Sequence, residues 1–130
     1  MHRFSSQSSI TRLKFAAILH CFGYLLVPLV IGIFGYSIYT QKDRLTFLAL
    51  GLGGCTVFII VIHWILAARA RCPLCMTPVL AGKKCSKHRD ARPLLGSYRL
   101  KVALCIVVQN KFRCPYCNEP SVMEVRKKLH

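Results

Sequence analysis

Four cysteines carry the clearest chemical signal in this 130-residue chain, because they occur in two near-identical short segments. The segments read Arg-Cys-Pro-Leu-Cys and Arg-Cys-Pro-Tyr-Cys, and a proline follows each after two further residues. The four thiols are those of Cys72, Cys75, Cys114 and Cys117. A Cys-x-x-Cys turn directs two sulfurs at one ion, and two such turns complete the tetrahedral shell that zinc prefers. The four cysteines are therefore the predicted ligands of one metal ion, with zinc favoured and iron as the alternative.

The paired Cys-Pro-x-Cys segments resemble the knuckles of the zinc-ribbon class of small metal-binding domains. The resemblance covers only the part of the chain that contains the two knuckles, and it points to no specific family. It implies a structural zinc ion and a β-rich fold in which each knuckle lies at the tip of a β-hairpin. The chain departs from the commonest ribbon pattern after each second cysteine, where Met76 and Asn118 replace glycine. The resemblance therefore leaves the geometry of the two turns open.

Three other interpretations use some of the same cysteines. The tetrapeptide 114–117 matches the glutaredoxin active site, but that fold needs a helix after the motif, which Pro120 opposes. A rubredoxin-like iron site uses a similar pair of turns and would make the protein an electron carrier. Cys85 and His88 could instead complete a Cys₃His site with the first knuckle, or contact the ligands of the metal. A solvated basic turn is the simpler interpretation of both residues.

Two apolar segments precede the cysteines and predict a membrane anchor. Residues 15–39 and 45–68 contain no Lys, Arg, Asp or Glu, and the short segment 40–44 joins them. A helix of 25 residues is about 37 Å long, enough to cross a hydrocarbon core of about 30 Å. The sequence therefore predicts a two-helix transmembrane hairpin over residues 15–68. A cleaved signal peptide is the alternative, but its apolar region would be shorter than the first segment.

The distribution of charge predicts the orientation of this hairpin. The chain is 54% hydrophobic, yet it has 19 Lys and Arg against 4 Asp and Glu, a formal net charge of +15. The basic residues lie outside the apolar segments. The positive-inside rule therefore places both termini of this integral membrane protein in the cytoplasm. Cytoplasmic thiols stay reduced, which favours a metal site over disulfides.

The segments around the hairpin complete the predicted architecture. Residues 1–14 are expected to be a basic tail, disordered or lying on the surface, and residues 126–130 a second basic tail. Residues 69–125 are expected to form the zinc-ribbon domain in the cytoplasm. Its expected strands are 76–80, 98–108 and 122–125, the second because apolar and polar residues alternate through much of it. The predicted fold class is a membrane α-helical hairpin followed by a small β-rich zinc-ribbon domain.

His20 and His63 are the residues within the two apolar segments whose side chains ionise near neutral pH. They lie at nearly equal distances from the turn, so an antiparallel hairpin brings them to a similar depth in the membrane. Two facing imidazoles could bind a haem or a chlorin, because intramembrane histidines are often functional. The favoured interpretation is that each hydrogen-bonds a neighbouring helix or extends towards the membrane interface.

The basic residues beyond the hairpin indicate the kind of partner. The candidate contacts to anionic lipid headgroups or to a protein are Arg69, Arg71, Lys83, Lys84, Lys87 and Arg89. Nucleic acid is a less favoured partner, because few aromatic residues accompany the charges. No nucleophile with a positioned base is visible, and four cysteines leave no open position on a metal, so an enzyme is not predicted. The predicted function is that of an accessory or scaffold subunit that docks to a partner in a membrane complex.

Overall fold

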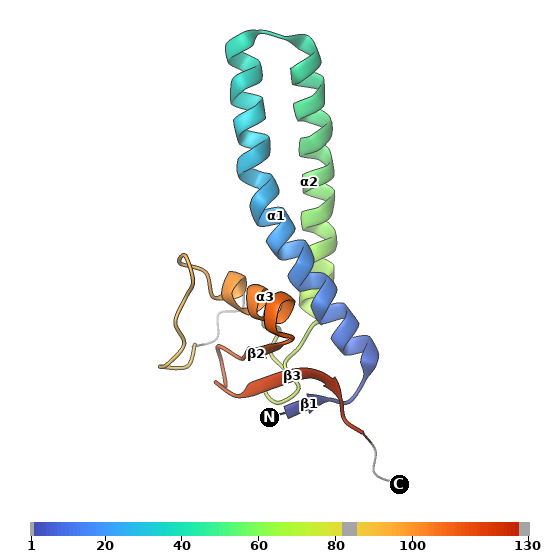
Figure 1. The fold of residues 1–130 in the computed structure, drawn as a ribbon, viewed down its shortest axis with the longest axis vertical. Helices are drawn as coiled ribbons and strands as arrows, with labels where there is room; N and C mark the ends of the chain where they lie inside the picture. Colours follow the sequence, from blue (N-terminus) through green and yellow to red (C-terminus); the bar gives the residue numbers. More distant parts are fainter. Residues whose placement is uncertain (1, 82–85, 128–130) are drawn as a thin grey trace.

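The computed structural model describes residues 2–81 and 86–127. Within this part the elements are β1 (His2–Phe4), α1 (Gln7–Thr40), α2 (Asp43–Arg69), α3 (Tyr98–Gln109), β2 (Lys111–Arg113) and β3 (Pro120–Val125). Helices α1 and α2 form a long antiparallel hairpin. The strands and α3 gather at the end of the hairpin that lies opposite its turn (Figure 1).

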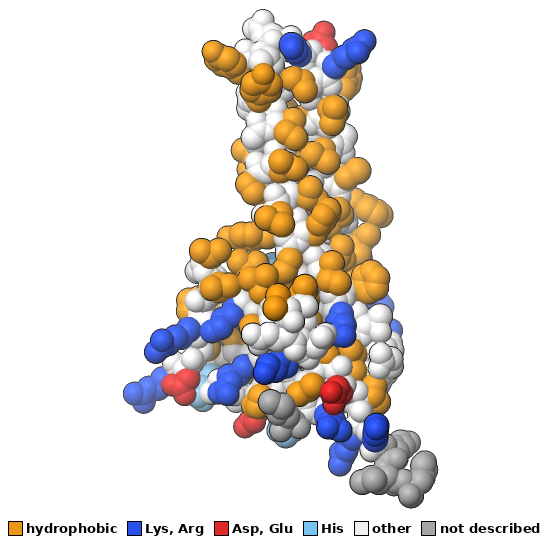
Figure 2. Space-filling view, in the orientation of Figure 1, with side chains coloured by type: hydrophobic (Ala, Val, Ile, Leu, Met, Phe, Trp, Pro, Cys, Tyr) orange, Lys and Arg blue, Asp and Glu red, His pale blue; other side chains and the backbone are white. Residues whose placement is uncertain are grey.

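The hairpin exposes an apolar surface along most of its length. Both helices are long and apolar enough to cross a membrane, and only 11% of the most apolar 18-residue stretch of each helix is buried. Hydrophobic side chains cover the hairpin, and most Lys and Arg side chains lie on the domain at its lower end (Figure 2). A core helix of a soluble protein would bury such a surface, so its exposure is typical of a membrane-spanning hairpin.

The turn and the contact between the two helices involve small and polar residues. Gln41 ends α1 in the left-handed conformation, with φ of 49°. Near the turn, the hydroxyl groups of Ser37 and Thr46 lie 2.7 Å apart and link the two helices. Further along, Ala49 is buried, and a Cβ atom built on Gly53 would lie 3.8 Å from the Val30 side chain. A Cβ atom at Gly53 would thus make only an ordinary contact, so the approach of the two backbones does not depend on this glycine.

The prediction of a disordered or surface-lying tail over residues 1–14 is wrong. Strand β1 pairs in parallel with β3, and α1 already begins at Gln7. Ile10 and Leu13 are among the most deeply buried side chains of the structure. They belong to an apolar stripe with Ala16 and Ala17 on one face of α1, and the surrounding serines and basic residues hid this stripe in the sequence.

The prediction of a strand over residues 98–108 is also wrong, because these residues form helix α3. The side chain of Ser97 accepts a hydrogen bond of 3.3 Å from the backbone N–H of Leu100 and caps the helix. Asn110 ends it in the left-handed conformation, with φ of 53°. Ala103 and Ile106 are buried, whereas Leu104 is exposed, so burial follows a helical face rather than alternate residues.

A three-stranded sheet in the order β1-β3-β2 completes the domain. Strand β3 includes the predicted strand 122–125 and pairs antiparallel with β2. The predicted strand 76–80 is reduced to an isolated bridge between Arg71 and Pro78. The domain is therefore mixed α and β rather than β-rich. Its core draws on α1, α2, α3, β1, β2, β3 and both knuckles, and its largest members are Phe4, Ile10, Leu13, Leu80, Ile106, Phe112 and Met123.

Candidate metal centre

The two cysteine segments fold into knuckles of the same shape. In the first, the N–H of Cys72 donates to the carbonyl oxygen of Thr77 at 3.0 Å, and the N–H of Met76 donates to the carbonyl oxygen of Cys72 at 3.1 Å. In the second, Cys114 and Asn118 take the places of Cys72 and Met76 with bonds of 3.2 and 2.9 Å. The sequence repeat is therefore a repeat of backbone geometry.

The residues that replace the glycine of zinc ribbons adopt the conformation that glycine favours. The φ angles of Met76 and Asn118 are 54° and 58°, both in the left-handed region. The turn therefore keeps its conformation without glycine. The residues that replace glycine adopt a backbone conformation that is unfavourable for residues with a side chain. Asn tolerates this region, whereas a residue such as Met is destabilised there by about 1–2 kcal/mol.

The four sulfur atoms lie at the spacing that a tetrahedral metal ion requires. All of them are within 4.8 Å of one another. The distance from Cys72 Sγ to Cys117 Sγ is 3.9 Å, and that from Cys75 Sγ to Cys114 Sγ is 3.7 Å. Disulfide sulfurs would be about 2.05 Å apart. Zinc–sulfur bonds of about 2.3 Å in a tetrahedron place the sulfurs about 3.8 Å apart, so the donor set fits a zinc or iron ion.

Backbone N–H groups support the first cysteine of each knuckle. The sulfur of Cys72 accepts from the N–H groups of Leu74 and Cys75. The sulfur of Cys114 accepts in the same way from the two corresponding residues of the second knuckle. Such bonds stabilise thiolates and orient them towards a metal.

The close packing of the thiols disturbs their ionisation. A hydrogen bond with the Cys114 thiol lowers the pKa of Cys72 to about 5, against the opposing effect of burial. The same bond, together with burial, raises the pKa of Cys114, and burial raises the pKa of Cys117. The thiolate form is therefore favoured at Cys72 and disfavoured at Cys114 and Cys117. A bound divalent cation would reduce this conflict, because its positive charge stabilises the thiolate form of each cysteine that it binds.

Of the alternative Cys₃His site, the structure describes Cys72, Cys75 and His88, whereas Cys85 lies outside the described residues. The N–H of Asp90 donates to Nδ1 of His88 at 3.2 Å, and the carboxylate of Asp90 lies 3.7 Å from the same atom. The backbone N–H of His88 also donates to the carbonyl oxygen of Pro115 at 2.7 Å. His88 thus supports the second knuckle through its backbone.

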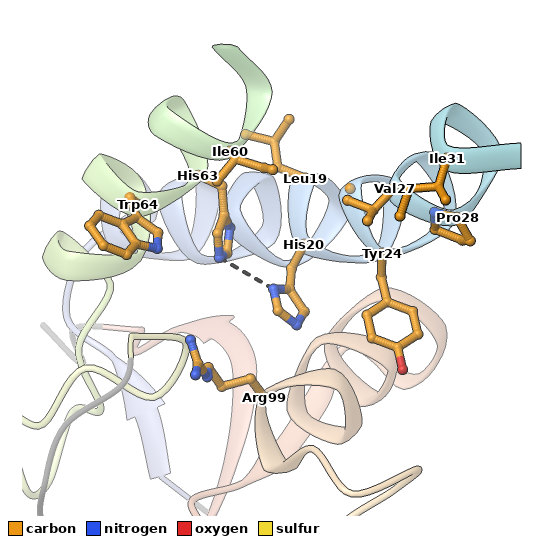
Figure 3. A pocket seen from close by; sticks show the side chains of 11 residues that line it. Leu19, His20, Tyr24, Val27, Pro28, Ile31, Ile60, His63, Trp64 and Arg99 are labelled. Carbon is orange, nitrogen blue, oxygen red and sulfur yellow. Dashed lines mark hydrogen bonds between the residues drawn. The ribbon is translucent and has the colours of Figure 1, made fainter. Parts of the chain in front are cut away.

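His20 and His63 meet between α1 and α2, as their distances from the turn predict. His20 Nδ1 lies 3.3 Å from His63 Nε2, and His63 Nδ1 lies 3.0 Å from the carbonyl oxygen of Ala16 (Figure 3). The favoured interpretation, a hydrogen bond to the neighbouring helix, is therefore confirmed for His63. Both ring nitrogens of His63 are engaged, so ligation of a haem or chlorin by His63 would require one of these contacts to break.

The predicted basic contact residues are placed differently from one another. Lys83 and Lys84 lie outside the described residues. Arg69, Arg71 and Arg89 are exposed. Lys87 is exposed as well, and its Nζ lies 4.5 Å from the centre of the Tyr98 ring.

A cavity of about 510 Å³ is a feature that the sequence did not reveal. It lies where the hairpin meets α3, and its lining includes both histidines together with Tyr24, Trp64 and Arg99 (Figure 3). The alternation of Arg99 and Lys101 with apolar residues contributed to the prediction of a strand, and this prediction separated Arg99 from the hairpin. An N-cap serine directly before Tyr98 was the available signal that a helix begins there.

Comparison of the chain with models of protein families, with curated proteins and with solved structures finds no match. The function is therefore inferred from the geometry of this chain alone.

Proposed function

We propose that this protein is a membrane-anchored zinc-binding protein whose metal domain serves as an accessory or scaffold module at the cytoplasmic membrane face. The observation that carries the proposal is the spacing of the four cysteine sulfurs, 3.7 and 3.9 Å across the two knuckles. A closed set of four thiolates suits a structural ion rather than a catalytic one, because it leaves no position for water or substrate.

A structural role for the metal is supported by where the ligands lie in the domain. Cys72 and Cys114 are fully buried members of the hydrophobic core. The segment from Ala70 to Ala81 contains no helix or strand of its own beyond an isolated bridge. A small domain of this kind gains much of its stability from a metal ion, which joins segments distant in the chain.

Membrane anchoring is supported by the exposed apolar surface of the hairpin and by the position of the charges. The domain lies at the end of the hairpin opposite the turn, and β1 and β3 both lie there (Figure 1). The exposed Arg69 and Arg71 follow directly on the second span. They would contact anionic headgroups of the cytoplasmic leaflet, each contributing about 1 kcal/mol. The domain would then present its remaining basic surface to a protein partner.

The decisive experiment is metal analysis and an absorption spectrum of the protein purified in detergent. We expect one zinc ion per chain and a colourless sample. One iron ion with thiolate-to-iron absorption in the visible range would instead identify a rubredoxin-like electron carrier, and a haem or chlorin spectrum would assign His20 and His63. A sample that binds neither metal at stoichiometric level would contradict the proposed centre.

The docking role needs a separate experiment in membranes. Cross-linking in intact cells followed by purification should recover a defined membrane partner whose yield depends on an intact metal domain. Recovery of RNA or DNA, with binding that falls steeply as salt rises, would point to a nucleic-acid-binding ribbon instead.

A further inference from the structure

The cavity between the hairpin and α3 has one polar end and one apolar end. Its polar end is formed by His20, His63 and Arg99, whose side chain points towards the two imidazoles (Figure 3). Its apolar end extends along α1 through Val27 to Ile31. Eleven residues separate His20 from Ile31, about 16 Å along the helix axis. The cavity is therefore shaped for an elongated molecule with one polar end.

The polar end lies at the depth of the lipid headgroups if the hairpin spans the bilayer. Thr40, at the end of α1, is twenty residues from His20, which corresponds to about 30 Å of helix and matches the hydrocarbon thickness. Helix α3, which carries Arg99, also exposes apolar residues. Val107 and Val108 are 46% and 74% exposed, as expected for a helix that lies in the interface.

The charge at this end has no carboxylate to balance it. All four acidic residues of the chain lie within its described part. Asp90, Glu119 and Glu124 face histidine or arginine side chains elsewhere, and Asp43 starts α2 at the far end of the hairpin. Arg99 lines this largely apolar cavity, is exposed and has no acidic partner, so its guanidinium can bind a phosphate group.

The histidine pair adds an unused acceptor. The carbonyl oxygen of Ala16 can only accept, so His63 Nδ1 carries a proton. With both imidazoles neutral, His63 Nε2 accepts from His20 Nδ1, and His20 Nε2 is left as an acceptor. This atom is buried and has no hydrogen-bond partner among the residues that the structure describes.

From these features we propose that the cavity binds one anionic phospholipid from the bilayer, with its phosphate at Arg99 and an acyl chain along α1. The proposal rests on the membrane insertion proposed above. A general attraction of basic residues to an anionic surface would not depend on any one of them. Here the preference for an anionic lipid depends on one guanidinium and on one apolar cavity. Phosphatidylglycerol meets the requirement, since its phosphate is anionic and its headgroup also carries hydroxyl donors.

Trp64 makes the proposal testable, because it is the single tryptophan of the chain and lines the cavity. The protein is reconstituted in phosphatidylcholine nanodiscs that contain a small, fixed fraction of lipid with brominated acyl chains, which quench tryptophan fluorescence. Brominated phosphatidylglycerol should bind beside Trp64 about fivefold more strongly than brominated phosphatidylcholine, the factor that one basic residue supplies near an anionic headgroup.

Three variants separate the site from diffuse surface charge. Arg99→Gln should abolish the preference, whereas Arg69→Gln, which removes an exposed charge outside the cavity lining, should keep it. Gly23→Leu keeps all charges but fills the cavity, and it should also abolish the preference. The Gly23 position tolerates a side chain, because no atom lies within 4 Å of a Cβ atom built there. Unchanged circular dichroism spectra establish that the variants are folded.

The outcomes distinguish this proposal from membrane insertion itself. Equal quenching by the two lipids in the unmodified protein would overturn the lipid site while confirming insertion. Equal loss of preference in Arg99→Gln and Arg69→Gln, or full preference in Gly23→Leu, would also overturn it. If neither brominated lipid quenched Trp64, the result would contradict both the insertion of the hairpin and the lipid site.

Discussion

The substitution Leu13→Ala tests whether the N-terminal segment is part of the folded domain. Leu13 is 1% exposed and belongs to the core that also contains Cys72 and Cys114. Replacing a buried leucine with alanine lowers the free energy of unfolding by about 2–5 kcal/mol. Since 1.4 kcal/mol corresponds to a factor of ten, the population of the opened domain should increase by a factor of between about thirty and several thousand.

Hydrogen–deuterium exchange measured by mass spectrometry is a suitable assay, because it reports opening of α3 and β3 separately from the hairpin. Amides that exchange through opening of the domain should accelerate by the same factor in Leu13→Ala, while those in the middle of α2 keep their rates. Leu25→Ala is the matched control, since Leu25 lies on the same helix and is 70% exposed. If both variants exchange alike to within about twofold, residues 7–17 are not a structural part of the domain. That result would refute the packing described for α1.

Three further predictions concern the metal centre and α3. Cys114→Ser should abolish stoichiometric metal binding while the hairpin stays inserted. The control Cys55→Ser, at an exposed position of α2, should retain full metal content. Full metal content in Cys114→Ser would disprove the ligand set. Met76→Gly should raise the urea midpoint of domain unfolding, because it relieves left-handed strain worth about 1 kcal/mol, and Asn118→Gly should raise it less; a lower midpoint in Met76→Gly would contradict the strain. Ser97→Ala removes the cap of α3 and should cost about 1 kcal/mol in the same measurement, with a change below about 0.3 kcal/mol speaking against the cap.

The parts of the structure that the sequence predicted are those with a strong local signal. The repeat of Cys-Pro-x-Cys places Cys72 and Cys114 in equivalent turns, and the shared chemistry of their sulfurs implies one centre. The apolar segments predict the two helices of the hairpin, because their length and composition are unusual outside a membrane. Counting residues from the turn also brings His20 to His63, since the rise of a helix is constant.

The parts that the sequence did not predict depend on packing between distant segments. The run from Leu100 to Val108 fits both an alternating and a helical pattern, and its β-branched residues favour a strand by propensity. The cap at Ser97 and the burial of one helical face against α1 stabilise α3 as a helix instead. Likewise, Ile10 and Leu13 have few apolar neighbours in sequence, so their burial arises only because α3 and β3 cover them. The cavity at Arg99 depends on this helix and could not be seen without it.

The metal centre and the hairpin form one mechanical unit, because no flexible linker separates them. Helix α1 runs without interruption from the core of the metal domain to the turn. Ala70 caps α2 through a hydrogen bond of its N–H to the carbonyl oxygen of Leu66, and Cys72 follows two residues later. The same cluster that places the knuckles also packs α3 against α1, and α3 carries Arg99 to the cavity. An ion bound by Cys72 and Cys114 would therefore be expected to stabilise the position of Arg99 relative to the hairpin, through the packing of α3 against α1.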